Sequence, residues 1–236
     1  KIKAKSSEDY TSKDLVMRVN TKGLHTENGL NIMQIPYTDD TNYVDEWILQ
    51  KVEMLFMLGI KVEGHDHYSC FPKIMDTMKA TFYNNYECIH TDSITKAEVL
   101  TYMESCGIYV SRSHGNYNSV GTYILLSEDE TKSFRSSDIF NYNTNTALVD
   151  LNDCELLLFV ACWTGKNEHS LPDAAVAAGA HYAVGFTEKI ICPIATKWTA
   201  LFSQYYKQGF TVEDSCRLAA EDCDNAGGID SYKVCS

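Results

Sequence analysis

His114 and Cys162 are the residues of this sequence whose types and positions best suit catalysis. His114 comes just after the strand-like segment 108–112, and Cys162 directly follows the almost unbroken apolar segment 155–161. A cysteine supplies a few per cent of a strong nucleophile at neutral pH, and a nearby imidazolium lowers its pKa further. If the two strands are neighbours, the thiol and the imidazole project from the same edge of a sheet. These parts suit the hydrolysis of an amide bond.

Gly115, which follows the candidate imidazole, predicts a second part of such a site. A glycine lets the backbone turn sharply and come close to a substrate. The amides of Gly115 and Cys162 can then point at the oxyanion that develops on a substrate carbonyl. A His-Gly or an Ala-Cys pair is common by chance, and a single buried cysteine is usually a small apolar core residue. Only the combination therefore predicts a catalytic site.

The elements that must position these residues alternate between strands and helices. Strands are expected over residues 30–35, 60–63, 86–90, 108–112, 120–126, 155–161 and 181–186. Three- and four-residue apolar spacing predicts helices over residues 44–58, 74–83, 95–105, 170–178, 193–208 and 212–223. This order predicts an α/β fold with an open, mostly parallel sheet and helices on both faces. Ligands of such sheets bind at the carboxyl ends of the strands, where His114 and Cys162 lie.

Two polar stretches interrupt this alternation. Residues 115–118 are rich in Gly and Asn and predict a turn. Residues 127–145 are polar throughout and predict a long exposed loop. Residues 1–28 have no sustained period and predict an N-terminal extension, so the expected domain covers residues 29–236.

The composition excludes several classes of protein. The 236 residues contain 44% hydrophobic and 22% charged residues, as is typical of a globular chain. Lys and Arg number 20 against 32 Asp and Glu, and the net charge of −12 opposes binding to nucleic acid or to an acidic membrane surface. The longest apolar run, residues 156–163, is too short to span a membrane.

The nine cysteines leave the redox state open. They include no C-x-x-C pair, which argues against zinc-ribbon and thioredoxin-like sites. One cysteine with a separate function would leave eight for pairing, but a fully reduced set is the alternative. The chain starts at Lys1 rather than Met, which predicts a mature or trimmed form of a longer precursor.

The motifs around the candidate residues resemble the catalytic pattern of the caspase-like cysteine peptidases, the group of caspases, legumain, clostripain and gingipains. The pattern is a strand with His114-Gly115 and, about fifty residues later, a strand with Ala161-Cys162-x-Thr164-Gly165. Downstream, Leu171-Pro172, Gly179-Ala180, Gly185-Phe186, Trp198, Phe202 and Gly209-Phe-Thr-Val make residues 86–224 similar to bacterial CHAT-domain and clostripain-like members.

The resemblance implies a three-layer caspase-like sandwich and a cysteine endopeptidase without a cofactor. Cys162 would be the nucleophile, His114 the general acid for the leaving amine, and the amides of Gly115 and Cys162 the oxyanion hole. The substrate would be a peptide or protein. The family's many exported bacterial members, with the missing start and possible cysteine pairing, favour a secreted or cell-surface bacterial protein over a cytoplasmic one.

The substrate pocket is expected to involve Val160, Trp163 and Glu188. Relatives that cut after Lys or Arg often carry Asp two residues before the nucleophile, where this chain has Val160. Glu188 could supply the acid instead, and Trp163 is expected to touch the substrate. The resemblance also leads to the hypothesis that the protein cleaves itself within residues 127–145, which contain Lys132 and Arg135.

Other readings of the sequence carry less support. His65, His67 and Cys70 have spacing that permits a metal site but lack a fourth ligand, so no metal is expected. Neither a P-loop nor a nucleophile elbow is present in full. The main alternative is a catalytically silent or partner-dependent CHAT-like interaction module within a larger assembly, because a fold does not guarantee activity. The presence of both His114 and Cys162 favours the enzyme.

Overall fold

A computed structural model describes most of the chain from residue 85 onward and several strands before it. The described residues are 19–20, 23–27, 30–32, 54–60, 85–91, 93–127 and 131–236. The expected helix over residues 74–83 and the His65, His67 and Cys70 group lie outside this part.

A six-stranded sheet forms the centre of the molecule. Its order is β14 (Tyr232–Cys235), β13 (Tyr182–Phe186), β12 (Leu156–Val160), β6 (Ile108–Arg112), β4 (Met54–Ile60) and β5 (Asn85–Thr91). All neighbouring pairs are parallel except β13 and β14. The prediction of a mostly parallel sheet is therefore confirmed, whereas the antiparallel edge strand β14 was not expected.

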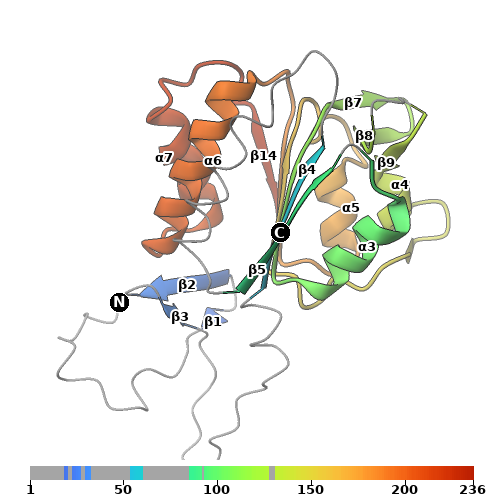
Figure 1. Ribbon diagram of the computed structural model, residues 1–236, viewed down its shortest axis with the longest axis horizontal. Coiled ribbons are helices and arrows are strands. Elements are labelled where there is room, and N and C mark those ends of the chain that lie inside the picture. Colours follow the sequence, from blue (N-terminus) through green and yellow to red (C-terminus); the bar gives the residue numbers. More distant parts are fainter. Residues whose placement is uncertain are drawn as a thin grey trace, which may run out of the picture.

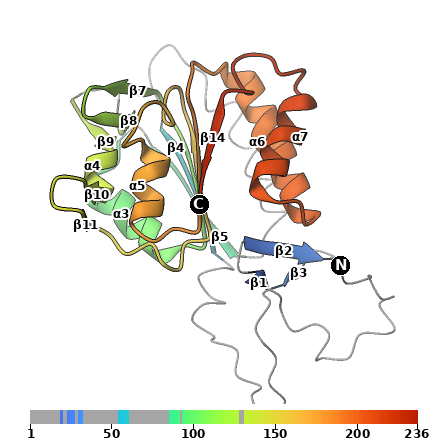
Figure 2. The same ribbon diagram turned by 180° about the vertical axis from the view of Figure 1, so that it is seen from behind.

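Helices cover both faces of this sheet (Figures 1 and 2). On one face lie α6 (Cys192–Lys207) and α7 (Val212–Glu221), and on the other lie α3 (Lys96–Ser105), α4 (Ser136–Ile139) and α5 (Leu171–Ala177). Strand residues alternate between the two faces, so Val110, Leu158 and Val184 pack in the core beneath α6 and α7. Tyr109, Leu157 and Ala183 pack in the core on the opposite face.

The mixed α/β architecture agrees with the fold class predicted from the sequence. Three of the helices begin where expected because a side chain caps their free amides: Thr95 and Ser170 each form a capping box, and the Thr211 side chain accepts a hydrogen bond from the Asp214 amide. Among the helices of the described residues, none has the length and apolar character needed to cross a membrane.

The prediction of a helix over residues 44–58 is wrong at its C-terminal end. Residues 54–60 form β4, an inner strand between β5 and β6, and Leu58 is fully buried. Six of its seven residues are apolar, as is typical of a parallel strand buried on both faces. Such a run also satisfies helical spacing, which explains the error. Of the strand expected over residues 60–63, Ile60 is the last residue of β4, and residues 61–63 lie outside the described part. Residues 44–53 lie outside the described part.

Small antiparallel sheets replace two of the expected loops. The predicted turn at 115–118 is the strand β7 (Gly115–Asn118), which pairs with β8 (Gly121–Leu125), and β8 pairs with β9 (Ser133–Arg135). Residues 127–145 are therefore not simply an exposed loop: they also contain α4 and β10 (Phe140–Asn141), which pairs with β11 (Thr146–Ala147).

The apolar residues of this polar stretch explain why it is ordered. Phe134 and Ile139 are fully buried in the core beside α5, so a few well-placed apolar side chains outweigh the polar composition. A further sheet of β1 (Val19–Asn20), β2 (Gly23–Glu27) and β3 (Leu30–Ile32) lies in the N-terminal region, where the sequence predicted an extension up to residue 28 and a strand over 30–35.

Most of the cysteines are free thiols. Those the structure describes as free are Cys106, Cys154, Cys162, Cys192, Cys216, Cys223 and Cys235. A set of four disulfides is therefore not formed, which removes the eight-cysteine pairing as an argument for an oxidising compartment.

Candidate active site

The strands that carry the candidate catalytic residues are direct neighbours. β6 and β12 pair in parallel register from Ile108 opposite Leu156 to Arg112 opposite Val160. His114 and Cys162 each follow two residues beyond the last pair of this register. Both segments therefore leave the sheet at the same carboxyl edge, as the sequence predicted, and this edge is where open α/β sheets bind ligands.

Gly115 brings the two segments into contact. A Cβ atom added at Gly115 would lie 2.2 Å from the carbonyl oxygen of Cys162 and 3.0 Å from the Cβ of Ala161. Because real side chains do not approach backbone this closely, any residue larger than glycine would push the Cys162 backbone away. The position after His114 therefore requires glycine, because the backbone of Cys162 lies too close for a side chain.

The Cys162 side chain is partly buried against the loop that follows β13. Its Sγ lies 3.4 Å from the Ile190 amide nitrogen and 3.6 Å from the Ile190 carbonyl oxygen. The Ile190 amide donates to the sulfur and the Cys162 thiol donates to the Ile190 carbonyl, so the backbone of one residue holds the thiol in place. Ile190 has no chemistry of its own in the sequence, so only the structure could identify this backbone contact.

The amide of Cys162 differs from those on either side of it. The amides of Ala161 and Trp163 donate to Phe159 O at 2.9 Å and Glu188 O at 3.0 Å. Within the described residues, the Cys162 amide donates to no backbone carbonyl. An unused amide at the tip of a strand is suited to bind an oxyanion.

Trp163 occupies a conformation that is unusual for a bulky residue. Its φ angle is +59°, in the left-handed region that normally favours glycine. The hydrogen bond from its amide to Glu188 and one from the Lys166 amide to its carbonyl, at 3.1 Å, hold it there. Backbone strain of this kind costs about 1–3 kcal/mol and concentrates at functional sites.

Thr164 anchors the turn after Cys162 through its hydroxyl, a role that the sequence analysis did not predict. The buried Oγ1 donates to Phe159 O at 2.9 Å and Ala161 O at 3.0 Å, and accepts from the Phe186 amide at 3.2 Å. The Thr164 carbonyl accepts from the Thr122 hydroxyl at 2.8 Å, which ties the turn to β8. These bonds fix the backbone on which Cys162 sits.

The other predicted site residues lie in different environments. His114 is partly buried, and its carbonyl accepts from the Leu125 amide at 2.9 Å. Val160 is only 3% exposed and belongs to the core beneath α6, so the structure places it below the surface. Glu188 is exposed beside Trp163 in the loop that also contacts the Cys162 thiol.

Arg112 is a buried arginine that links the carboxyl end of β6 to helix α6. Arg112 is 2% exposed, and its guanidinium donates to Thr196 Oγ1 at 2.6 Å and to Cys192 O at 3.2 Å. These acceptors lie in the first turn of α6, so the arginine links the end of β6 to the start of that helix. The sequence analysis missed this link, because its acceptors lie about eighty residues further along the chain.

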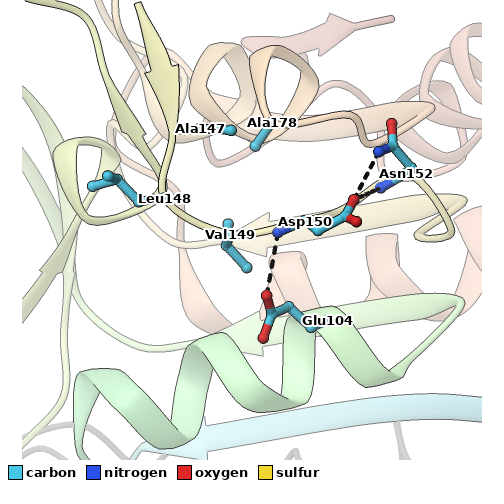
Figure 3. A pocket seen from close by; sticks show the side chains of 7 residues that line it. All are labelled: Glu104, Ala147, Leu148, Val149, Asp150, Asn152 and Ala178. Atoms are coloured by element: carbon cyan, nitrogen blue, oxygen red, sulfur yellow. Dashed lines mark hydrogen bonds between the residues drawn. The ribbon is translucent and has the colours of Figure 1, made fainter. Parts of the chain in front are cut away.

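The cavity in Figure 3 belongs to the opposite edge of the sheet. It encloses about 400 Å³ and is lined by Glu104, Ala147, Leu148, Val149, Asp150, Asn152 and Ala178. Asp150 accepts from Asn152, and its own amide donates to Glu104 at 3.2 Å. Because these residues precede β12 and β13, the cavity is separate from the candidate site.

The described residues offer no metal site near the thiol. No group of three or more His, Cys, Asp or Glu side chains in this part of the chain is arranged to hold an ion.

The order of the strands and the helices on both faces are consistent with a caspase-like fold. Among solved structures, the chain is similar to the complex of the pro- and mature domains of RgpB from Porphyromonas gingivalis, with a TM-score of 0.58 and 10% identity over 79% of this chain and 48% of that one. It is also similar to the Arg-specific cysteine proteinase gingipain R (RgpB), with a TM-score of 0.57 and 10% identity over 79% and 47%.

These similarities concern the fold alone. This chain spans about half the length of the two gingipain chains. No protein-family model and no curated protein matches the sequence.

Proposed function

We propose that the protein is a cysteine endopeptidase with Cys162 as nucleophile and His114 as general acid. The observation that carries this proposal is the close approach of Gly115 to the Cys162 carbonyl at the shared end of β6 and β12. The same fold in an Arg-specific cysteine proteinase supports it. Within the caspase-like group, the sequence motifs favour the clostripain-like and CHAT-domain branches.

The proposed reaction has two stages. The Cys162 thiolate attacks the carbonyl carbon of the scissile peptide bond, and the amides of Cys162 and Gly115 stabilise the oxyanion. His114 protonates the amine as the C–N bond breaks, which leaves a thioester on Cys162. A water molecule then gives up a proton to His114 and attacks the thioester, which releases the acid and restores the Cys162 thiolate beside the protonated His114. No cofactor takes part.

Glu188 and Trp163 are proposed to contact the substrate. The Glu188 carbonyl accepts a hydrogen bond from the Trp163 amide, and the exposed side chain of Glu188 supports a role in binding substrate. A Lys or Arg preference would implicate this carboxylate. Val160, by contrast, could affect a pocket only through the core packing around it.

Activation by self-processing is proposed for the stretch 127–145. Lys132 is exposed and precedes β9, which makes it the accessible position for cleavage. Arg135 is partly buried in β9, and its guanidinium lies 4.7 Å from the centre of the Tyr123 ring. Cleavage there would first require β9 to separate from β8.

Hydrolysis of a positional fluorogenic peptide library tests the function. The wild type should cleave peptides, whereas Cys162→Ala and His114→Ala should reduce the rate by at least about 100-fold. Cys235→Ala, which removes another partly buried thiol at the far edge strand β14, should retain cleavage. If the wild type cleaves no peptide, even after limited proteolysis at 127–145, the alternative of a partner-dependent enzyme or an interaction module is favoured.

A further inference from the structure

Three side chains form a surface beside Cys162, and of these only Trp163 has been given a role, in contacting the substrate. The Tyr117 and Trp163 ring centres are 6.1 Å apart, and the Lys166 ammonium lies 5.2 Å from the centre of the Tyr117 ring. We call Tyr117, Trp163 and Lys166 the aromatic platform. Its residues come from both sides of the site, since Tyr117 follows His114 by three positions and Trp163 adjoins Cys162.

The platform is accessible yet fixed in place. Tyr117 is 40% exposed, while Trp163 and Lys166 are partly buried. The backbone of residues 163–166 is held in a turn by the positive φ of Trp163 and by the hydrogen bond from the Lys166 amide to the Trp163 carbonyl. A rigid aromatic surface next to a nucleophile can bind a substrate side chain with little loss of conformational entropy.

The charge of Lys166 is the distinctive feature of this surface. Its ammonium lies on an aromatic ring and, among the residues the structure describes, pairs with no carboxylate. The chain has 32 acidic residues against 20 basic ones, so a cation at this surface contrasts with the overall negative charge. A carboxylate that approached Lys166 would find a cation already positioned by Tyr117, and the methylene groups behind that carboxylate could pack on Trp163.

We propose that the aromatic platform is a specificity subsite that binds an acidic side chain of the peptide substrate near the scissile bond, with Lys166 as its cation. The proposal rests on the proposed function of Cys162. It gives the site two charges of opposite sign, Lys166 on the platform and Glu188 in the neighbouring loop. A basic side chain at the platform would meet the repulsion of Lys166.

The test separates binding from cleavage. Binding is measured with the Cys162→Ala protein by fluorescence anisotropy on peptides that differ only in Glu, Gln or Lys at each position of a fixed sequence. At one position, the Glu peptide should bind about fivefold more tightly than the Gln peptide at low salt, as is typical of a partly exposed ion pair. Added salt should reduce this difference.

Matched variants assign the difference to the platform. In the Cys162→Ala background, Lys166→Met should abolish the preference for Glu, and Lys166→Arg should retain it. Lys197→Met, which removes an equal charge from the exposed side of α6, should leave it unchanged. A preference for Glu that survives Lys166→Met, equal binding of the Glu and Gln peptides, or no measurable binding at any position would overturn the proposal.

Cleavage by the wild type distinguishes the two proposals. If the Lys166-dependent preference is present but no Cys162-dependent cleavage occurs, the subsite holds and the proposed function fails. If cleavage occurs without the preference, the proposed function holds and the subsite fails.

Discussion

Close packing at single residues determines whether the candidate site can form. The backbone of Cys162 lies against Gly115, so the absence of a side chain at Gly115 controls the position of the proposed nucleophile and of the two proposed oxyanion amides. Trp163 then takes a strained φ immediately after the thiol, and Thr164 fixes the turn through its buried hydroxyl. Three consecutive residues from Cys162 onward therefore have distinct geometric roles.

Gly115→Ala should damage both the site and the fold. The added methyl group would stand 2.2 Å from the Cys162 carbonyl oxygen, so the two strand ends must separate. We expect a loss of about 2 kcal/mol in unfolding free energy, as is typical of overpacking, and a drop of at least about 100-fold in Cys162-dependent cleavage.

Urea denaturation and peptide hydrolysis measure the two effects of Gly115→Ala. Val120→Ala, at a 67% exposed position of the same hairpin, is the control and should leave both quantities near their wild-type values. Wild-type cleavage and stability in Gly115→Ala would show that the two segments are not held as closely as described.

At the scale of elements, the edge strand β14 holds the loop 163–170, which follows Cys162, against the sheet. Lys233 on β14 pairs with Asp173 on α5 at 2.6 Å and donates to the Asn167 carbonyl at 3.4 Å. Asp173 also caps its own helix through Ser170. One lysine thereby connects the last strand, the start of α5 and the loop 163–170.

The pair of Lys233 and Asp173 makes stability depend on pH. Burial alone would raise the pKa of Asp173, but hydrogen bonds from Lys233 and Ser170 outweigh it and lower the pKa. A carboxyl whose pKa is lower in the folded state stabilises the protein above its unfolded pKa of about 3.9, and this contribution is lost as the pH falls through the folded value.

Lys233→Met should therefore destabilise the protein most near neutral pH. We expect a cost of about 1 kcal/mol at pH 7, since both side chains are partly exposed, with a smaller difference from wild type as the pH falls below about 4. Denaturation of both proteins across this range measures the difference. Lys96→Met, which breaks the more exposed pair with Asp138, is the control. A difference independent of pH would show that Lys233 acts through packing.

The elements also show what the sequence could predict. Segments with one clear pattern, such as the apolar run of β12 and the capped helix α3, were predicted correctly because local chemistry alone specifies them. β4 was mistaken for the end of a helix because a continuous apolar run satisfies both periods. The order in 127–145 was missed because Phe134 and Ile139 are buried by contacts distant in sequence.

The residues of the candidate site can also be divided into those that the sequence could predict and those that it could not. His114, Gly115 and Cys162 could be singled out because each follows a recognisable strand. The Ile190 contact with the thiol, the Arg112 link to α6 and the platform cation could not be, since they depend on segments that meet only in the folded chain.

At the scale of the whole molecule, the fold is shared with gingipain chains about twice as long. The central sheet and its two cores provide the scaffold, while the residues proposed for function gather at one edge of that sheet. This separation is typical of α/β folds, in which loops at strand ends change without loss of the core.

The thiol content of the whole chain can be counted directly. Because seven cysteines are free in the structure, denatured protein prepared without reductant should react with at least seven equivalents of a thiol reagent. Prior treatment with dithiothreitol should leave the unfolding temperature unchanged, unless it reduces a bond between the other two cysteines. Fewer than seven reactive thiols would mean that disulfides form between elements that the structure keeps apart.

The rate at which each cysteine reacts with iodoacetamide at pH 6, measured by peptide mapping, tests the central claim most directly. An activated Cys162 should be alkylated at least about tenfold faster than the partly buried Cys192 and Cys235, and His114→Ala should remove this advantage. Equal alkylation of Cys162 and Cys192 in the wild type, or a fast Cys162 that is insensitive to His114→Ala, would contradict the proposed pairing of thiol and imidazole.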